Sequence, residues 1–146
     1  MPEDAEVTND LLDSLVGYRL RQAMTRVFAD FLVTMEDMQL RPVPFAILAV
    51  IRENPGINQT TLGGTLGIQR TNLVPLIGEL KTRALVERRP VPTDRRAFAL
   101  HLSPTGERIF AQAAQRVIAH EERLLGGISV DQRRLLLDLL DRIGSE

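Results

Sequence analysis

The segment from residue 58 to residue 102 constrains the fold more than any other part of the chain. Leucine and isoleucine recur at helical spacing on both sides of Gly67, which predicts two short helices joined by a glycine turn. Residues 84–86 and the alternating apolar side chains of residues 98–102 predict two strands. Between them lies a basic loop, residues 89–96, which its two prolines make stiff and extended. Helix, turn, helix and wing in this order form a shape that can place its second helix in a DNA major groove.

Positive charge is concentrated on the second helix and the wing. Residues 68–96 hold seven cations and three anions, a net charge of +4, whereas the whole chain carries −1. Such a local stripe is typical of a surface that meets phosphate, although a run of charge can also be a solvated face. Because these charges fall on the two elements that would meet DNA, we expect DNA binding. The expected contacts are Arg70, Thr71, Asn72, Pro75, Lys81, Arg89, Asp94, Arg95 and Arg96.

The second helix carries both base-reading side chains and an unusual proline. Asn72 can pair with adenine and Arg70 with guanine. Pro75 offers only an apolar contact, for example to a thymine methyl group. A proline costs about 3 kcal/mol inside a helix, so we expect the helix to begin near residue 71 or 72, or else to bend.

At these residues the chain resembles the MarR family of transcriptional regulators. The matching motifs are LGIQRTN at the turn, LVERRPVPTDRRAFALHLSPTGE after the second helix, and the Asp-x-Arg pattern of residues 94–96 within it. The resemblance implies a mainly α fold, an α+β winged helix, in which residues 1–146 form one domain. Residues 42–102 would form the winged helix-turn-helix, and residues 10–36 and 104–146 the dimerisation helices.

The resemblance also assigns roles in the wing. Arg96 matches the family's minor-groove arginine, and Asp94 would fix the wing by pairing with a neighbouring arginine. Arg95, which points to the opposite side of an extended chain, would meet phosphate or solvent. Pro75 stands where family members often carry a longer polar or basic residue, which puts the usual base contact there in doubt.

The flanking segments are predicted to be helices with wide apolar faces. One long helix is expected from about residue 10 to residue 35, and its stripe suits either an ordinary core helix or a helix that also packs on a second subunit. Another helix should begin after the Ser103 cap, and a last one, residues 130–143, should pack on the first helix and also on that of a partner. Since both ends carry more apolar surface than a monomer can hide, we predict a two-fold homodimer on a pseudo-palindromic operator.

The composition argues against several other classes of protein. The absence of cysteine excludes disulfides, zinc–thiolate sites and thiol-based redox sensing. His101 and His120 lie far apart in sequence, so both are expected to be structural, and no enzyme, metal site or cofactor is predicted; a lesser alternative is that His101 lines a pocket. No run is long enough to span a membrane, and the acidic start, residues 1–10, is expected to be frayed and is unlike a signal peptide. The predicted location is therefore cytoplasmic.

A small effector is the expected regulator. The resemblance implies binding of an aromatic acid or its thioester between the dimer helices and the winged domain. The candidates are Arg21 as carboxylate clamp, with Tyr18, Arg19 and Phe45. The alternative is that both arginines are exposed and Phe45 belongs to the core.

These observations predict a ligand-responsive DNA-binding regulator, a repressor that the effector releases. Two other classes use a winged helix: a module that binds protein, and a detached dimerisation domain of a methyltransferase. Neither needs arginines on the wing.

Overall fold

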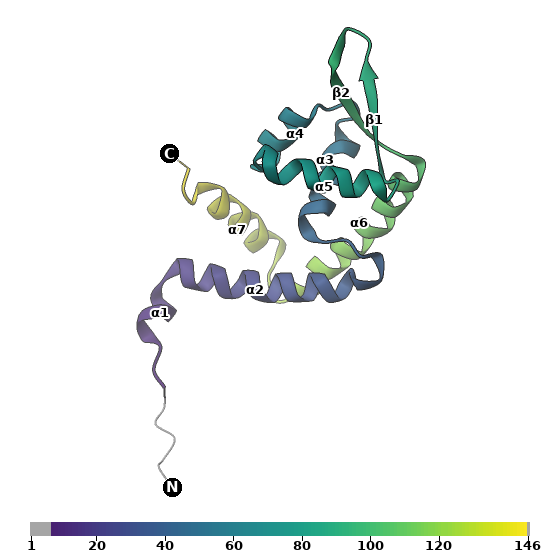
Figure 1. Cartoon of the computed structure of the whole chain (residues 1–146). Helices are drawn as coiled ribbons and strands as arrows, with labels where there is room; N and C mark the ends of the chain where they lie inside the picture. Colours follow the sequence, from purple (N-terminus) through teal and green to yellow (C-terminus); the bar gives the residue numbers. More distant parts are fainter. Residues whose placement is uncertain (1–6, 146) are drawn as a thin grey trace.

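The computed structural model describes residues 7–145, so the part of the acidic start formed by residues 1–6 lies outside it (Figure 1). In chain order the elements are α1 (Asp10–Ser14), α2 (Val16–Thr34), a 3-10 turn η1 (Glu36–Met38), α3 (Pro42–Glu53), α4 (Gln59–Leu66), α5 (Arg70–Thr82), β1 (Val86–Val91), β2 (Asp94–Leu102), α6 (Pro104–Leu124) and α7 (Val130–Arg142). Helices with a two-stranded antiparallel wing confirm the predicted winged-helix class.

Most of the core lies inside the winged half of the molecule, and the end of α2 and the middle of α6 also contribute to it. Three side chains of α3, Ile47, Leu48 and Ile51, are fully buried. They pack with the buried leucines and isoleucine of α4 and α5 and with the base of the wing, where Leu100 is 1% exposed. Burial of one such side chain contributes about 1.5–3 kcal/mol, so this cluster holds the two helices and the wing as one body.

Caps, a glycine and two prolines define the helix ends, and the predicted Ser103 cap and Gly67 turn are confirmed. The side chain of Asn58 accepts a hydrogen bond from the Thr61 amide at 2.8 Å, and that of Ser103 accepts one from the Gly106 amide at 2.9 Å. Gly67 ends α4 in the left-handed region, with φ of 64°. Proline occupies the first position of both α3 and α6, where its missing N–H breaks no helical bond.

The first predicted helix is interrupted. Leu15 is extended, with φ of −89° and ψ of 120°, and separates α1 from α2. Ser14 donates its hydroxyl to the Leu11 carbonyl at 2.7 Å, an alternative to the helical bond, and Gly17 lowers the helix propensity just beyond. The expectation of one continuous helix was wrong, because the apolar spacing runs through the break unchanged.

The wing is a longer hairpin than expected. The segment 89–96 was predicted to be loop, yet β1 continues to Val91 and β2 begins at Asp94, which leaves a turn at residues 92–93. Pro90 pairs with Phe98, and the register then jumps so that Val91 pairs with Asp94. A proline fits here because a two-stranded sheet has a free edge on each strand and does not need every N–H. The jump leaves Arg95 and Arg96 in a bulge at the tip.

The last helix does not pack on the first within a single chain. None of the α7 residues is buried, and Leu135 and Leu139 are 57% and 44% exposed. On α2, Met24 and Phe28 are 61% and 40% exposed. The predicted packing of the last helix on the first is wrong within one chain, and its packing on a partner's helix stays a prediction. The apolar faces of both helices are open, as a surface for a second subunit requires.

Candidate nucleic-acid interface

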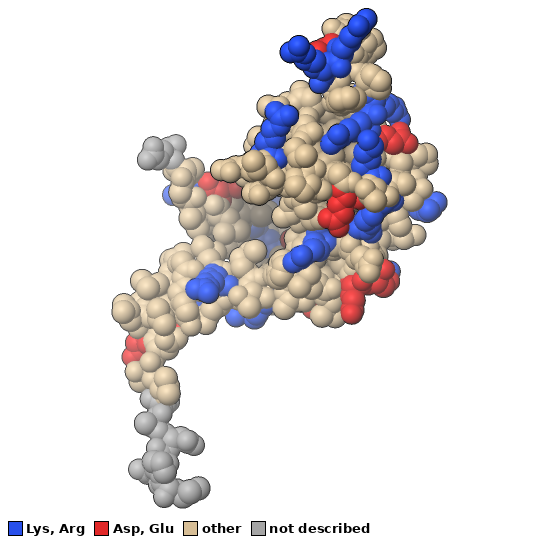
Figure 2. Space-filling view, in the orientation of Figure 1, with Lys and Arg blue, Asp and Glu red and all other residues tan. Residues whose placement is uncertain are grey.

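A hollow of about 880 Å³ opens between α4, the start of α5 and the wing. Its wall contains Asn58, Gln59, Thr60 and Thr61 from the start of α4, Arg70, Leu73 and Val74 from the start of α5, and Arg88, Asp94, Arg96 and Phe98 from the hairpin. Figure 2 shows Lys and Arg atoms gathered at the tip of the wing. The predicted helix-turn-helix and wing therefore share one concave, cationic surface.

Close packing at Gly63 sets the angle between α4 and α5. A Cβ atom at Gly63 would lie 3.0 Å from the Ile68 carbonyl oxygen and 3.2 Å from a methyl of Leu73. The close approach of α4 to the turn and to α5 therefore requires a glycine at this position. At Gly64 a Cβ atom would meet nothing within 4 Å. Because Gly63 has no side chain, α4 can pack closely against the turn and α5, and the first residues of α5 then lie at the hollow.

The start of α5 presents Arg70, Thr71 and Asn72 to solvent, whereas Leu73 is buried. The helix begins at Arg70, which excludes the expected later start and puts Pro75 inside the helix, beyond its first turn. Pro75 is exposed and lacks the N–H that would bond the Thr71 carbonyl. The predicted base-reading residues therefore lie together at one end of the helix.

In the wing, Asp94 acts on the backbone. Its Oδ1 accepts a hydrogen bond from the Arg96 amide at 2.9 Å, and no ion pair of Asp94 occurs among residues 7–145. The expected pairing with a neighbouring arginine was wrong: the carboxylate closes a short turn that orients Arg96. Arg96 lines the hollow and Arg95 does not, in agreement with their predicted opposite directions.

Arg88 is a candidate contact that the sequence-based selection of contact residues missed. It lies on β1 opposite Leu100 and lines the hollow. Its Nε is buried and has no hydrogen-bond partner. The two-residue period of a strand could have identified it, because Arg88 lies two residues after the apolar Val86 and therefore on the same face of the strand. Because Arg88 lines the hollow, its charge can attract an anion that enters there.

Three other cations lie away from the hollow. Lys81 is in the last turn of α5, about 16 Å along the axis from Arg70. Arg89 pairs with Glu87 at 3.1 Å. Arg83 donates to the carbonyls of Gln39 and Met38 at 2.9 and 3.0 Å. The net charge of the segment therefore overstates what faces the hollow.

The four predicted effector residues are not brought together in one chain. Arg19 pairs with Asp13 at 3.5 Å, and the Tyr18 hydroxyl lies 3.4 Å from the Asn9 amide nitrogen. Phe45 stacks on Phe110, with ring centroids 5.4 Å apart, and both rings are half-buried. Arg21 is exposed at the edge of a second hollow of about 440 Å³, which is shallow, mostly apolar and formed by α2 alone, with Met24, Phe28 and Leu32 in its lining.

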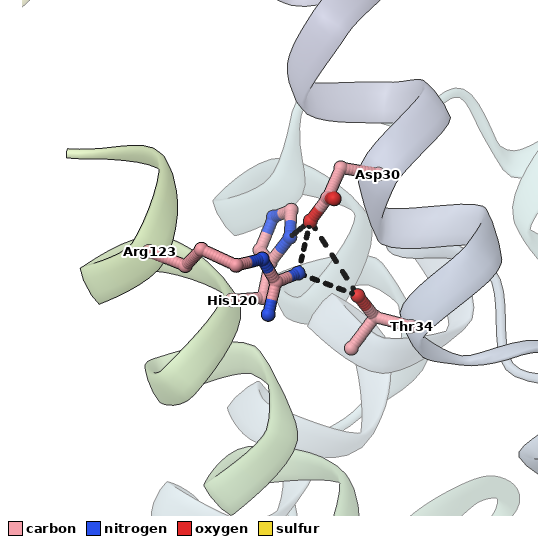
Figure 3. A network of polar contacts seen from close by, with 4 residues as sticks. All are labelled: Asp30, Thr34, His120 and Arg123. Carbon is pink, nitrogen blue, oxygen red and sulfur yellow. Dashed lines mark hydrogen bonds and ion pairs between the residues drawn. The ribbon is translucent and has the colours of Figure 1, made fainter. Parts of the chain in front are cut away.

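A polar network joins α2 to α6 (Figure 3). The buried His120 donates from Nδ1 to Oδ2 of Asp30 at 2.5 Å, and Arg123 donates to the same oxygen at 2.5 Å and to Thr34 at 3.2 Å. These hydrogen bonds, from His120 and then Arg123, hold the pKa of Asp30 below its usual value. His120 thus has a structural partner. His101 is half-buried in β2 beside Gly56.

Within residues 7–145 there is no group of three or more His, Cys, Asp or Glu side chains placed to hold a metal ion. None of the helices described has the length and apolar character to cross a membrane.

Fold and site together define a winged helix-turn-helix protein. Its second motif helix, α5, which occupies the place of the recognition helix in such proteins, and its arginine-bearing wing face one hollow. The MarR family profile matches residues 38–97. The transcriptional repressor CouR, in its structure bound to a 23-mer DNA duplex, is 39% identical, with a TM-score of 0.91 over 97% of this chain and 100% of that one. CouR bound to p-coumaroyl-CoA gives 37% identity and a TM-score of 0.85, over 97% and 99% of the two chains.

A putative transcriptional regulatory protein for the hcr operon of Thauera aromatica is 29% identical over 95% of this chain and 84% of its own length. The chain belongs to the MarR family of transcriptional regulators.

Proposed function

We propose that this protein is a homodimeric repressor that binds a pseudo-palindromic operator and is released by an aromatic acid or its thioester. The observation that carries the proposal is the similarity along the entire chain to a repressor in its DNA-bound form. The arginines on the wing count against a winged helix that only joins proteins. Such a regulator works on the chromosome, so its place is the cytoplasm, and it needs no catalytic activity, cofactor or metal.

The geometry suggests how one protomer holds a half-site. The start of α5 enters the major groove, where Asn72 pairs with adenine, Arg70 with guanine, and Thr71 and Pro75 touch neighbouring groups. Arg96, oriented by Asp94, enters the minor groove, whose negative potential attracts arginine. Arg88 holds a phosphate inside the hollow. The remaining cations, Lys81, Arg89 and Arg95, add sequence-independent attraction.

A second copy of the chain covers the open apolar faces of α1, α2 and α7. Large apolar side chains with 40% or more of their surface exposed lie on all three helices, and a monomer in water would leave them solvated. Two-fold pairing then presents two wings to one face of the duplex, with half-sites about one helical turn apart.

The effector belongs in the second hollow, along α2, where the second copy of the chain would close the other side, so that Met24 and Phe28 serve both the interface and the ligand site. Its apolar lining suits an aromatic ring, and Arg21 at its edge can bind a carboxylate or thioester oxygen. Arg21 is a better candidate than Arg19, which already has Asp13 as a partner. Tyr18 can contribute from one turn earlier, whereas the stacked Phe45 would act by supporting α3. CouR was solved with p-coumaroyl-CoA, so a CoA thioester of this kind is the first compound to try.

The test is DNA release followed by fluorescence anisotropy. An operator obtained by selection from random duplexes is titrated with protein, and p-coumaroyl-CoA, p-coumarate or free CoA is then added. We expect the thioester or the acid to lower DNA affinity, and free CoA to leave it unchanged. Arg21→Ala should keep DNA affinity and lose the response. Release of the variant at the same effector concentration would exclude Arg21 as the clamp.

A further inference from the structure

Arg83 is a cation of the basic segment that turns away from the hollow. It caps the C-terminal end of α5 and is half-buried. Its Nη1 donates to the carbonyl of Gln39 at 2.9 Å and its Nη2 to the carbonyl of Met38 at 3.0 Å. Gln39 is in the left-handed region, with φ of 49°, where η1 ends and its last carbonyls lack helical donors. The planar fork of a guanidinium can reach two consecutive carbonyls at once.

The η1 turn is itself fixed to the dimer arm, by which we mean α1 and α2. It follows α2 directly, and the buried Met35 and Leu40 anchor its two ends in the core. Asp37 forms a bidentate ion pair with Arg116 of α6. A turn earlier on α2, the network of Asp30 in Figure 3 makes a second connection to α6. A movement of α2 or α6 therefore moves η1 with it.

Among the side-chain hydrogen bonds found in residues 7–145, those of Arg83 are the ones that link α5 or its cap to another element. The opposite end of α5, about 20 Å away, carries the residues that face DNA. Because the core holds α5 and the rest of the winged half as one body, a shift of η1 acts through Arg83 on the direction of that body, and so on the end of α5 that faces DNA.

We propose that Arg83 is a positioning residue that ties the recognition helix to the dimer arm and thereby sets the distance between the two recognition helices of the dimer. This inference rests on the proposed function, because the distance matters only on a two-half-site operator. The duplex fixes the half-site spacing, so a tether that fixes the helix distance selects operators by spacing. Water can replace the guanidinium at the carbonyls, so the loss of the tether lets the winged half turn against the dimer arm without unfolding it.

The test compares half-site spacing in operators selected from random duplexes. The variant Arg83→Met keeps the apolar stem and removes the donors, and Arg83→Lys keeps the charge and removes the fork. The matched control is Arg41→Met, which removes one exposed cation two residues after Gln39 whose side chain makes no hydrogen bond or ion pair within residues 7–145.

Wild type and Arg41→Met should enrich one spacing. In Arg83→Met and Arg83→Lys the preference for that spacing over one base pair more or less should fall at least about fivefold, the lower end of typical couplings between sites. A purely structural role would lower total enrichment and leave the spacing unchanged, and that result overturns the inference. If thermal melting shows Arg83→Met to be unfolded, Arg83→Lys decides alone. If wild type enriches no sequence at all, the proposed function itself fails, which is a distinct outcome.

Discussion

Replacing Arg88 by methionine should weaken DNA binding without weakening the fold. The buried Nε of Arg88 has no partner, so the folded protein bears the desolvation of a donor and gains no hydrogen bond for it. Methionine keeps an unbranched apolar stem of similar reach against the wall of the hollow. We therefore expect the free energy of unfolding to stay within about 0.5 kcal/mol of the wild-type value or to rise.

The loss in DNA binding follows from counting phosphates. Each phosphate contact contributes about 0.9 to the slope of log affinity against log salt, and a dimer carries Arg88 twice, so the slope should become shallower by about 1.8. Salt raised from about 50 to about 200 mM is a fourfold change. Over that range wild-type affinity should therefore fall about twelvefold more than that of Arg88→Met.

The assay is anisotropy of a labelled operator at several salt concentrations, with urea unfolding of the same preparations. Arg108→Met is the control for net charge, since Arg108 is exposed on α6 and is not part of the hollow. It should leave the slope near the wild-type value. If Arg88→Met keeps the wild-type slope, or loses affinity only in proportion to a loss of stability, then Arg88 does not hold a phosphate.

Three further outcomes are expected. Gly106→Ala would place a Cβ 2.0 Å from the Leu85 carbonyl oxygen and should lower the free energy of unfolding in urea by about 3 kcal/mol, whereas Gly78→Ala, with nothing within 4 Å, should raise it by about 0.5–1 kcal/mol; equal effects would contradict the packing of α6. The pKa of Asp30 is lowered from 3.8 in the fold, so its ionised carboxylate stabilises the folded state above that pH, and this stabilisation is lost as the pH falls toward the lower folded pKa. Asp30→Asn should therefore lower the urea midpoint at neutral pH and match wild type in strong acid. A lower midpoint of the variant that persists in strong acid would count against the network. By light scattering, wild type should be a dimer at micromolar concentration and Leu139→Asp a monomer, and a wild-type monomer would refute the interface.

The helix-turn-helix could be predicted because its determinants are local. The cap at Asn58, the left-handed Gly67 and the apolar spacing on either side act within a few residues of one another, so each leaves a signal in the sequence. The break at Leu15 leaves none, because the apolar stripe continues across it.

The wing shows where a local rule misleads. The prolines predict a loop, but a proline interrupts a strand only if its missing N–H has a partner to lose. Pro90 lies in a two-stranded sheet, and that context depends on where α4, α5 and β2 pack. Strand ends could therefore not be fixed before the tertiary arrangement was known.

The cations show the same limit for the candidate site. The number of charges can be read from the sequence, but the direction in which each side chain points cannot. Arg83 turns inward to two carbonyls, Arg89 pairs with Glu87, and Arg88 faces the hollow. The effector residues were chosen by type on neighbouring helices, and the pairing of Arg19 with Asp13 arises only after the chain breaks at Leu15. Their assignment stays a prediction.

The ratio of specific to non-specific DNA affinity tests the central proposal most directly. The operator recovered by selection and a scrambled duplex of the same length and composition are titrated with the dimer at one physiological salt concentration. We expect at least about a thousandfold tighter binding to the operator, one dimer per duplex, and a recovered sequence with two-fold symmetry and half-sites about one turn apart. Equal affinity for the two duplexes, or binding that does not change with salt, would contradict it.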